Sequence, residues 1–227
     1  MPETVGVVPL DGRGALPFAD LHREVLFLHA VRALLEVDRL DGGVVVTVDP
    51  DQRAAAVAAL VRSGLPGVVQ DADAWWRSVV RPSAGRDVVP VTLVLHDPLC
   101  PLVPGTFVRS CLDEAAPVPS GRTAGRPALA AYRPVTDTIK TVVDDQIADT
   151  LDRDLFGIVA SPVIFALQHG AAEPPPTTDF GELATWLRAR GDVVFRKAPS
   201  LGRRVDDPSA VNLLECMDEL ARSVRES

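Results

Sequence analysis

Short apolar segments alternate with helical segments along the first 135 residues, and this alternation limits the possible folds more than any other feature. Buried strands are expected in five short apolar runs, at 5–9, 43–48, 66–69, 91–95 and 127–132. Helices are expected between them, over about 19–37, 50–62 and 105–114. Strands that alternate with helices build a mostly parallel sheet covered on both faces. The pattern therefore predicts an α/β, Rossmann-like fold.

The alternation stops after residue 135, where the chain becomes polar up to residue 154. Segments 141–143 and 147–151 form possible hairpin strands around Asp144 and Asp145. An excursion of this kind from an α/β core usually covers an active site or pairs with another subunit. We therefore expect one domain over 1–227 with a protruding arm at about 138–156.

The rest of the chain returns to core elements. A strand is expected to resume at 158–160, and another lies at 193–195. Thr178 is a suitable N-cap for a helix that runs to about Arg190. A last helix is expected from Pro208 to about Val224.

Charge and composition exclude several classes of protein. The formal net charge of −8 and a pI near 5.0 argue against a general nucleic-acid binder, which needs a basic face. The three cysteines are scattered without metal-ligand or disulfide spacing. The first residues lack a basic segment followed by a long apolar run, so we expect no secretory signal, and no apolar run is long enough to span a membrane. These features predict a cytoplasmic protein.

Polar side chains follow the strand that ends near Val135. Asp137, Thr138 and Lys140 offer a carboxylate, a hydroxyl and an ammonium in four residues. Open α/β sheets bind their ligands beyond the carboxyl ends of the strands, so this segment is a candidate site. The alternative is an exposed turn with ordinary polar residues.

Two further candidates also follow expected strands. Gly12 and Gly14 lie after the first strand, where glycines let backbone N–H groups approach phosphates. Asp97 ends the strand 91–95 and is a reasonable ligand for Mg²⁺ bound to phosphates. The alternatives are an ordinary turn for the glycines and a helix or turn cap for Asp97. His96, beside it, is expected to be structural.

Other candidate residues lie outside the strand ends. Asp73 and Ser78 flank two tryptophans in a segment that could hold a nucleotide base, although the pattern favours a helix with the tryptophans in the core. Arg153 in the arm and Arg204 near the end could bind phosphate bidentately. Their alternative is a solvated surface position.

Taken in order, these motifs resemble the 2-C-methyl-D-erythritol 4-phosphate cytidylyltransferases of isoprenoid biosynthesis. The resemblance extends from Val5 to about Leu214 and is strongest over Pro134–Lys140. Three shorter stretches support it, at Val94–Asp97, Leu151–Arg153 and Thr177–Asp179.

The resemblance implies a role for each matching residue. Asp97 would bind Mg²⁺, and Asp73 and Ser78 would face the cytidine of CTP. The acceptor, a phosphorylated polyol, would be held by five residues, namely Thr138, Lys140, Arg153, Ser161 and Thr178. Arg153 would come from the second subunit of a homodimer formed through the arm at 141–154. The acceptor phosphate would attack the α-phosphorus of CTP and release pyrophosphate.

The chain departs from the family at three places. Asp11 places a negative charge in the loop where the triphosphate should lie, and Arg13 is the remaining basic residue there. Pro98–Cys100 replaces two small residues and an arginine, and Arg204 stands near the place of a family lysine. Losing a cation from such a site can cost several kcal/mol of transition-state stabilisation.

Three hypotheses follow from the match and its departures. The first is a working cytidylyltransferase that acts on this substrate or a related polyol or sugar phosphate. The second is a degenerate, non-catalytic paralogue that keeps the fold and the dimer and binds a ligand or partner. The third is a structural or regulatory dimer that binds no nucleotide.

Overall fold

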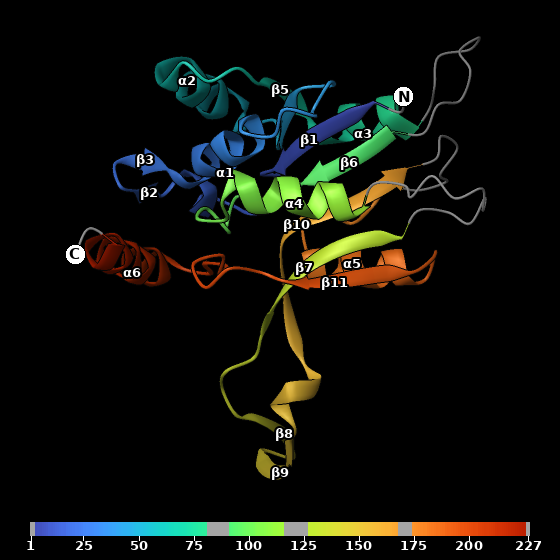
Figure 1. Cartoon of the computed structure of the whole chain (residues 1–227), viewed down its shortest axis with the longest axis vertical. Coiled ribbons are helices and arrows are strands. Elements are labelled where there is room, and N and C mark those ends of the chain that lie inside the picture. Colours follow the sequence, from blue (N-terminus) through green and yellow to red (C-terminus); the bar gives the residue numbers. More distant parts are fainter. Residues whose placement is uncertain (1–2, 81–90, 116–126, 168–173, 226–227) are drawn as a thin grey trace.

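The computed structural model describes residues 3–80, 91–115, 127–167 and 174–225. Seven strands of these residues form one sheet in the order β11-β7-β10-β6-β1-β4-β5 (Figure 1). Their bounds are β1 (Thr4–Pro9), β4 (Val44–Val48), β5 (Val68–Asp71), β6 (Val91–Leu95), β7 (Ala128–Pro134), β10 (Gly157–Leu167) and β11 (Val193–Lys197). Within this sheet β10 runs antiparallel to β6 and β7, and the other pairs are parallel. The predicted α/β fold with a mostly parallel sheet is confirmed.

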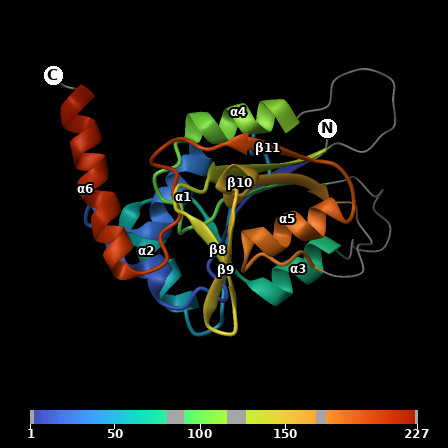
Figure 2. The same ribbon diagram turned by 90° about the horizontal axis from the view of Figure 1, so that it is seen from below.

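Helices cover both faces of the sheet, as Figure 2 shows. One face packs against α1 (Leu26–Leu35), α2 (Arg53–Ser63) and α4 (Gly105–Ala115), and the other packs against α3 (Ala72–Val80) and α5 (Phe180–Arg188). Successive strand residues point to opposite faces. Val94 accordingly joins the first core, whereas Leu93 and Leu95 join the second. None of the helices in the described segments is long and apolar enough to cross a membrane.

The helix expected over 19–37 begins only at Leu26. Before it, β2 (Asp20–Leu21) and β3 (Glu24–Val25) form a short hairpin after a 3-10 turn, η1 (Leu16–Phe18). The φ angles of His22 and Arg23 are +52° and +64°, a conformation that belongs to a tight hairpin turn and not to a helix. The tertiary fold overrides the helical spacing here, because the backbone N–H of His22 donates to Glu215 on the C-terminal helix α6 (Pro208–Arg225).

The N-cap of α5 is Asp179, so the prediction of Thr178 was wrong. The Asp179 carboxylate accepts hydrogen bonds from the backbone N–H groups of Gly181 and Glu182, at 2.6 and 3.0 Å. A carboxylate at this position satisfies free backbone donors and interacts favourably with the helix dipole. Thr178 is therefore left exposed beside the glycine loop that follows β1.

The predicted hairpin is confirmed as an arm that projects from the sheet (Figure 1). Its strands are β8 (Ile139–Val143) and β9 (Gln146–Leu151), joined by Asp144 and Asp145 at φ angles of +49° and +61°. Two residues with positive φ match the right-handed twist of a hairpin, and Asp tolerates that conformation. A short 3-10 turn, η2 (Arg153–Leu155), then leads into β10.

Candidate functional site

The carboxylate of Asp97 lies at the centre of the candidate site, just beyond the end of β6. Its side chain is 2% exposed. Oδ1 accepts hydrogen bonds from Arg13 Nε at 3.2 Å and from the backbone N–H of Leu99 at 3.1 Å. Oδ2 accepts from Arg204 Nε at 3.1 Å. One buried carboxylate thus connects the loop after β1, the end of β6 and the segment before α6.

The guanidinium of Arg13 faces the protein interior. Its side chain is 2% exposed, and besides Asp97 it donates from Nη1 to the carbonyl of Asp11 and from Nη2 to the carbonyl of Thr177, at 3.3 and 2.7 Å. Each of its nitrogens therefore has a partner within the chain. This arrangement suits a residue that holds the loop in place, whereas the sequence had suggested a contact with triphosphate.

Arg204 differs from Arg13 because part of its side chain is open to solvent. Its side chain is 34% exposed, with Nε on Asp97 and Nη1 paired to Asp206. Its Nη2 hydrogen-bonds to no residue in the described part of the chain. Burial by itself lowers the pKa of Arg204, but the charge of Asp97 and the hydrogen bond to it outweigh burial and raise the pKa. Arg204 therefore stays charged and can offer an edge of its guanidinium to an anion.

The glycine loop after β1 is held by the carboxylates of the chain itself. The backbone N–H of Gly12 donates to Asp49 Oδ2 at 2.9 Å. Asp11 is buried, and its carboxylate accepts from Thr47 Oγ1 at 2.6 Å and from Thr177 Oγ1 at 3.5 Å. The negative charge predicted to lie in the triphosphate position is thus directed into the protein.

Two further sequence candidates, Ser161 and Thr178, are placed at this centre. The Ser161 side chain is fully buried, and its Oγ accepts a hydrogen bond from the backbone N–H of Asp97 at 3.0 Å. Thr178 lies against the loop, since a Cβ added to Gly12 would come within 2.6 Å of its methyl group. Ser161 therefore supports Asp97 from inside, whereas Thr178 lies at the surface of the site.

The arm residues do not reach this centre within one chain. Lys140 donates to Thr150 Oγ1 across the hairpin at 3.0 Å, and Arg153 donates to the carbonyl of Thr136 at 2.6 Å. Thr138 is exposed at the start of the arm. Because the arm projects away from the sheet, its residues lie apart from Asp97 within the chain (Figure 1).

The nucleotide-base candidates, Asp73 and Ser78, lie exposed on α3. Ser78 Oγ donates to the carbonyl of Trp75 in its own helix at 2.6 Å. Trp75 and Trp76 are buried between the sheet and α3, which confirms the alternative that the tryptophans belong to the core. Neither indole ring is therefore available to stack on a base.

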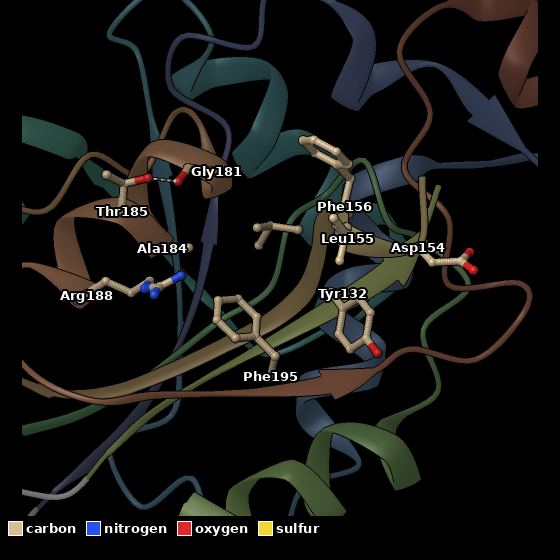
Figure 3. A pocket seen from close by; sticks show the side chains of 11 residues that line it. Tyr132, Asp154, Leu155, Phe156, Gly181, Ala184, Thr185, Arg188 and Phe195 are labelled. Carbon is tan, nitrogen blue, oxygen red and sulfur yellow. Dashed lines mark hydrogen bonds between the residues drawn. The ribbon is translucent and has the colours of Figure 1, made fainter. Parts of the chain in front are cut away.

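A cavity that the sequence analysis did not identify lies at the base of the arm (Figure 3). Its volume is about 610 Å³, and it is bounded by β7, η2, β10, α5 and β11. Tyr132, Phe156 and Phe195 supply aromatic walls, and Arg188 of α5 supplies a cation. Leu155, 80% exposed at its edge, could have indicated this surface, because a large apolar residue stands there among charged neighbours.

The residues around Asp97 do not fit the Mg²⁺ that the family resemblance implies. Mg²⁺ needs oxygen ligands in a nearly octahedral arrangement and usually keeps several waters. Both oxygens of Asp97 already accept N–H groups, two of these from guanidinium ions that repel a second cation. The carboxylate is also too buried to admit a hydrated ion. Binding of Mg²⁺ by Asp97 therefore stays a prediction, and the hydrogen bonds and burial of its carboxylate argue against it.

Comparison with known proteins supports the fold and a distant sequence relationship. No family model matches the chain. A bifunctional enzyme IspD/IspF from Solidesulfovibrio magneticus is 31% identical over 165 residues, in a match that covers 67% of this chain. The matched region is 39% of that protein, so the chain spans about two fifths of the length of this curated relative.

Solved structures match over nearly the whole chain. The 4-diphosphocytidyl-2C-methyl-D-erythritol synthase of Anaerococcus prevotii superimposes with a TM-score of 0.67 at 11% identity, covering 96% of both chains. A CMP:2-keto-3-deoxy-manno-octonic acid synthetase complexed with CTP gives 0.62 at 14% identity, covering 96% of this chain and 99% of that one. The resemblance predicted from the motifs is confirmed at the level of the fold.

Proposed function

Because the chain has the nucleotidyltransferase fold of the IspD-like proteins, we propose that it transfers CMP from CTP to a phosphorylated polyol or sugar, with release of pyrophosphate. The preferred acceptor is 2-C-methyl-D-erythritol 4-phosphate. The main support for the proposal is that the glycine loop, Thr178 and Arg204 lie around Asp97, beyond the carboxyl ends of the strands. This is where open α/β sheets bind their ligands.

The reaction needs positioning and charge neutralisation more than covalent chemistry by the protein. An oxygen of the acceptor phosphate attacks the α-phosphorus of CTP, and the bond from that phosphorus to the oxygen of the β-phosphate breaks. Pyrophosphate leaves with the electron pair. In this proposal Arg204 contacts the phosphates, the backbone at Gly12 and Gly14 lines the triphosphate path, and Asp73 and Ser78 face the cytidine.

The acceptor side of the site requires a second subunit. The arm carries exposed apolar side chains at Val142, Val143 and Ile147, about 60% exposed each. We place these side chains in a homodimer contact that brings Thr138, Lys140 and Arg153 of one arm to the site of the other subunit. Burial of this apolar surface supplies the association energy.

The dimer is tested by light scattering after size-exclusion chromatography. The double substitution Val142→Asp and Ile147→Asp is expected to yield a monomer, because it buries two charges in an apolar contact. Leu220→Asp is the matched control, since Leu220 is an equally exposed apolar residue on α6, away from the arm. A dimer that survives the double substitution contradicts the arm assignment.

The activity is tested by measuring pyrophosphate release from CTP with 2-C-methyl-D-erythritol 4-phosphate. Arg204→Ala is expected to lower the rate by about 100-fold or more, the usual cost of losing one donor to a transition-state charge. Arg203→Ala is the control, because Arg203 is the exposed neighbour and contacts the sulfur of Met217. Equal rates for the two variants would contradict the role of Arg204.

A specific observation also favours the second candidate, a non-catalytic paralogue that binds its ligand without turnover. Asp49 already binds the Gly12 N–H, and Asp97 is already paired with two arginines. CTP binding without pyrophosphate release from any polyol or sugar phosphate would support this candidate over the enzyme.

A further inference from the structure

We propose that the centre of this site works without a protein-bound divalent cation and that the guanidinium groups of Arg13 and Arg204 replace it. Asp97 is then a positioning residue that orients the two arginines, and Arg204 is the group that contacts a phosphate. The assignment of Asp97 follows from the geometry of the chain alone. The phosphate contact of Arg204 rests on the proposed function.

The first argument is the hydrogen-bond capacity of Asp97. A carboxylate offers about four lone-pair positions. Three of them accept N–H groups from Arg13, Leu99 and Arg204, all within 3.2 Å. With the side chain 2% exposed, the remaining position on Oδ2 has almost no access to solvent. A metal ion could bind here only by displacing one of these partners.

The second argument is the cost of such a displacement. An arginine stays protonated, so neither guanidinium can give up its charge to make room for a cation. The Arg13 side chain is as buried as Asp97, and its other contacts are to neutral carbonyls of Asp11 and Thr177. Removing Asp97 from Arg13 would leave a buried charge without a counter-ion, which is strongly unfavourable. The ion pair therefore excludes the metal.

The third argument is the orientation of Arg204. Its Nε is fixed by Asp97 and its Nη1 by Asp206, so the plane of the guanidinium is set before any ligand arrives. The side chain is 34% exposed, and Nη2 has no hydrogen-bond partner among the residues that the structure describes. A pre-oriented guanidinium donates charge-assisted hydrogen bonds to phosphate oxygens, which is the contribution otherwise made by a metal ion.

The test for the metal uses Mn²⁺ as the probe, followed by electron paramagnetic resonance on the full chain without nucleotide. We expect wild type and Asp97→Asn to bind the same amount of Mn²⁺. His22, Glu215 and Glu219 form a separate cluster that could hold an ion, so both proteins also carry His22→Ala in a parallel set. A Mn²⁺ site that disappears in Asp97→Asn would overturn the inference.

The test for the phosphate contact is calorimetric titration of CTP in EDTA and in excess Mg²⁺. We expect equal affinity in both, with Arg204→Ala about tenfold weaker in EDTA and Arg203→Ala unchanged. CTP binding that requires Mg²⁺ overturns the replacement of the cation by Arg204 at the phosphates but leaves the proposed function standing, and the Mn²⁺ comparison decides the assignment of Asp97. No CTP binding in either condition overturns the proposed nucleotide function and the phosphate contact, and the Mn²⁺ comparison then decides the assignment of Asp97. If Asp97→Asn does not fold, the His22→Ala form alone decides the assignment: no bound Mn²⁺ in that form sustains it, and a bound ion counts against it.

Discussion

Replacing Asp97 by Asn probes the centre of the site with almost no change in volume. The amide keeps one oxygen that can accept the Leu99 N–H, but its NH2 group now faces a guanidinium N–H, so a donor meets a donor. The charge that balances Arg13 is also lost. Because the Arg13 side chain is 2% exposed, water cannot replace the missing partner.

The size of the effect follows from this burial. Breaking a buried ion pair by removing one partner costs roughly 3–5 kcal/mol. Arg204 adds little, because its side chain is 34% exposed and keeps Asp206 as a partner. We therefore expect a loss of about 3–4 kcal/mol in the free energy of unfolding, or a fall in Tm of roughly 6–15 °C for a chain of this size.

The measurement is equilibrium unfolding in urea, monitored by circular dichroism, with Asp206→Asn as the control. Asp206 pairs with the same Arg204, but its side chain is 70% exposed, so its loss should cost below about 1 kcal/mol. A loss of less than about 1 kcal/mol for Asp97→Asn would refute the buried pairing. So would equal losses for the two variants.

Three further predictions concern single residues. Burial lowers the pKa of His96 to about 4 from an ordinary value of 6.5, so the unfolded chain binds a proton that the folded chain refuses. The contribution of His96 to the free energy of unfolding is complete above pH 6.5 and falls by about 3 kcal/mol as the pH drops to 4. Urea denaturation at several pH values across that range should show this loss in wild type but not in His96→Gln. Gly12→Ala should destabilise the protein by about 2 kcal/mol or more, because φ is +69° and the new methyl group meets Thr178. Gly14→Ala should cost only about 1 kcal/mol in the same urea assay, because φ is +58° but no atom lies near the new methyl group. The exposed thiol of Cys216 should react with an aromatic disulfide reagent in the native state, while the other two cysteines, whose pKa values are raised by burial, should react only after denaturation; three fast thiols would contradict the burial.

The sequence alone determined the features that depend on neighbouring residues. The apolar runs became the strands of the sheet, and the two aspartates at positive φ closed the arm where the polar segment predicted a hairpin. The tryptophans of α3 are in the core, as the pattern favoured. These features follow from local periodicity and turn chemistry, which a linear sequence records directly.

The tertiary structure decided where the side chains at the site point and what they bind. Asp97 meets Arg13 across 84 residues of sequence and Arg204 across 107 residues. Contacts between distant segments likewise decide the direction of the Asp11 side chain and the turn at His22, after which α1 begins at Leu26. They also form the cavity at the base of the arm. Sequence spacing supplies the candidate residues, but only tertiary packing decides which oppositely charged residues form a buried pair. The carboxylate that the sequence predicted as a metal ligand is accordingly paired with two arginines that lie far from it in the sequence.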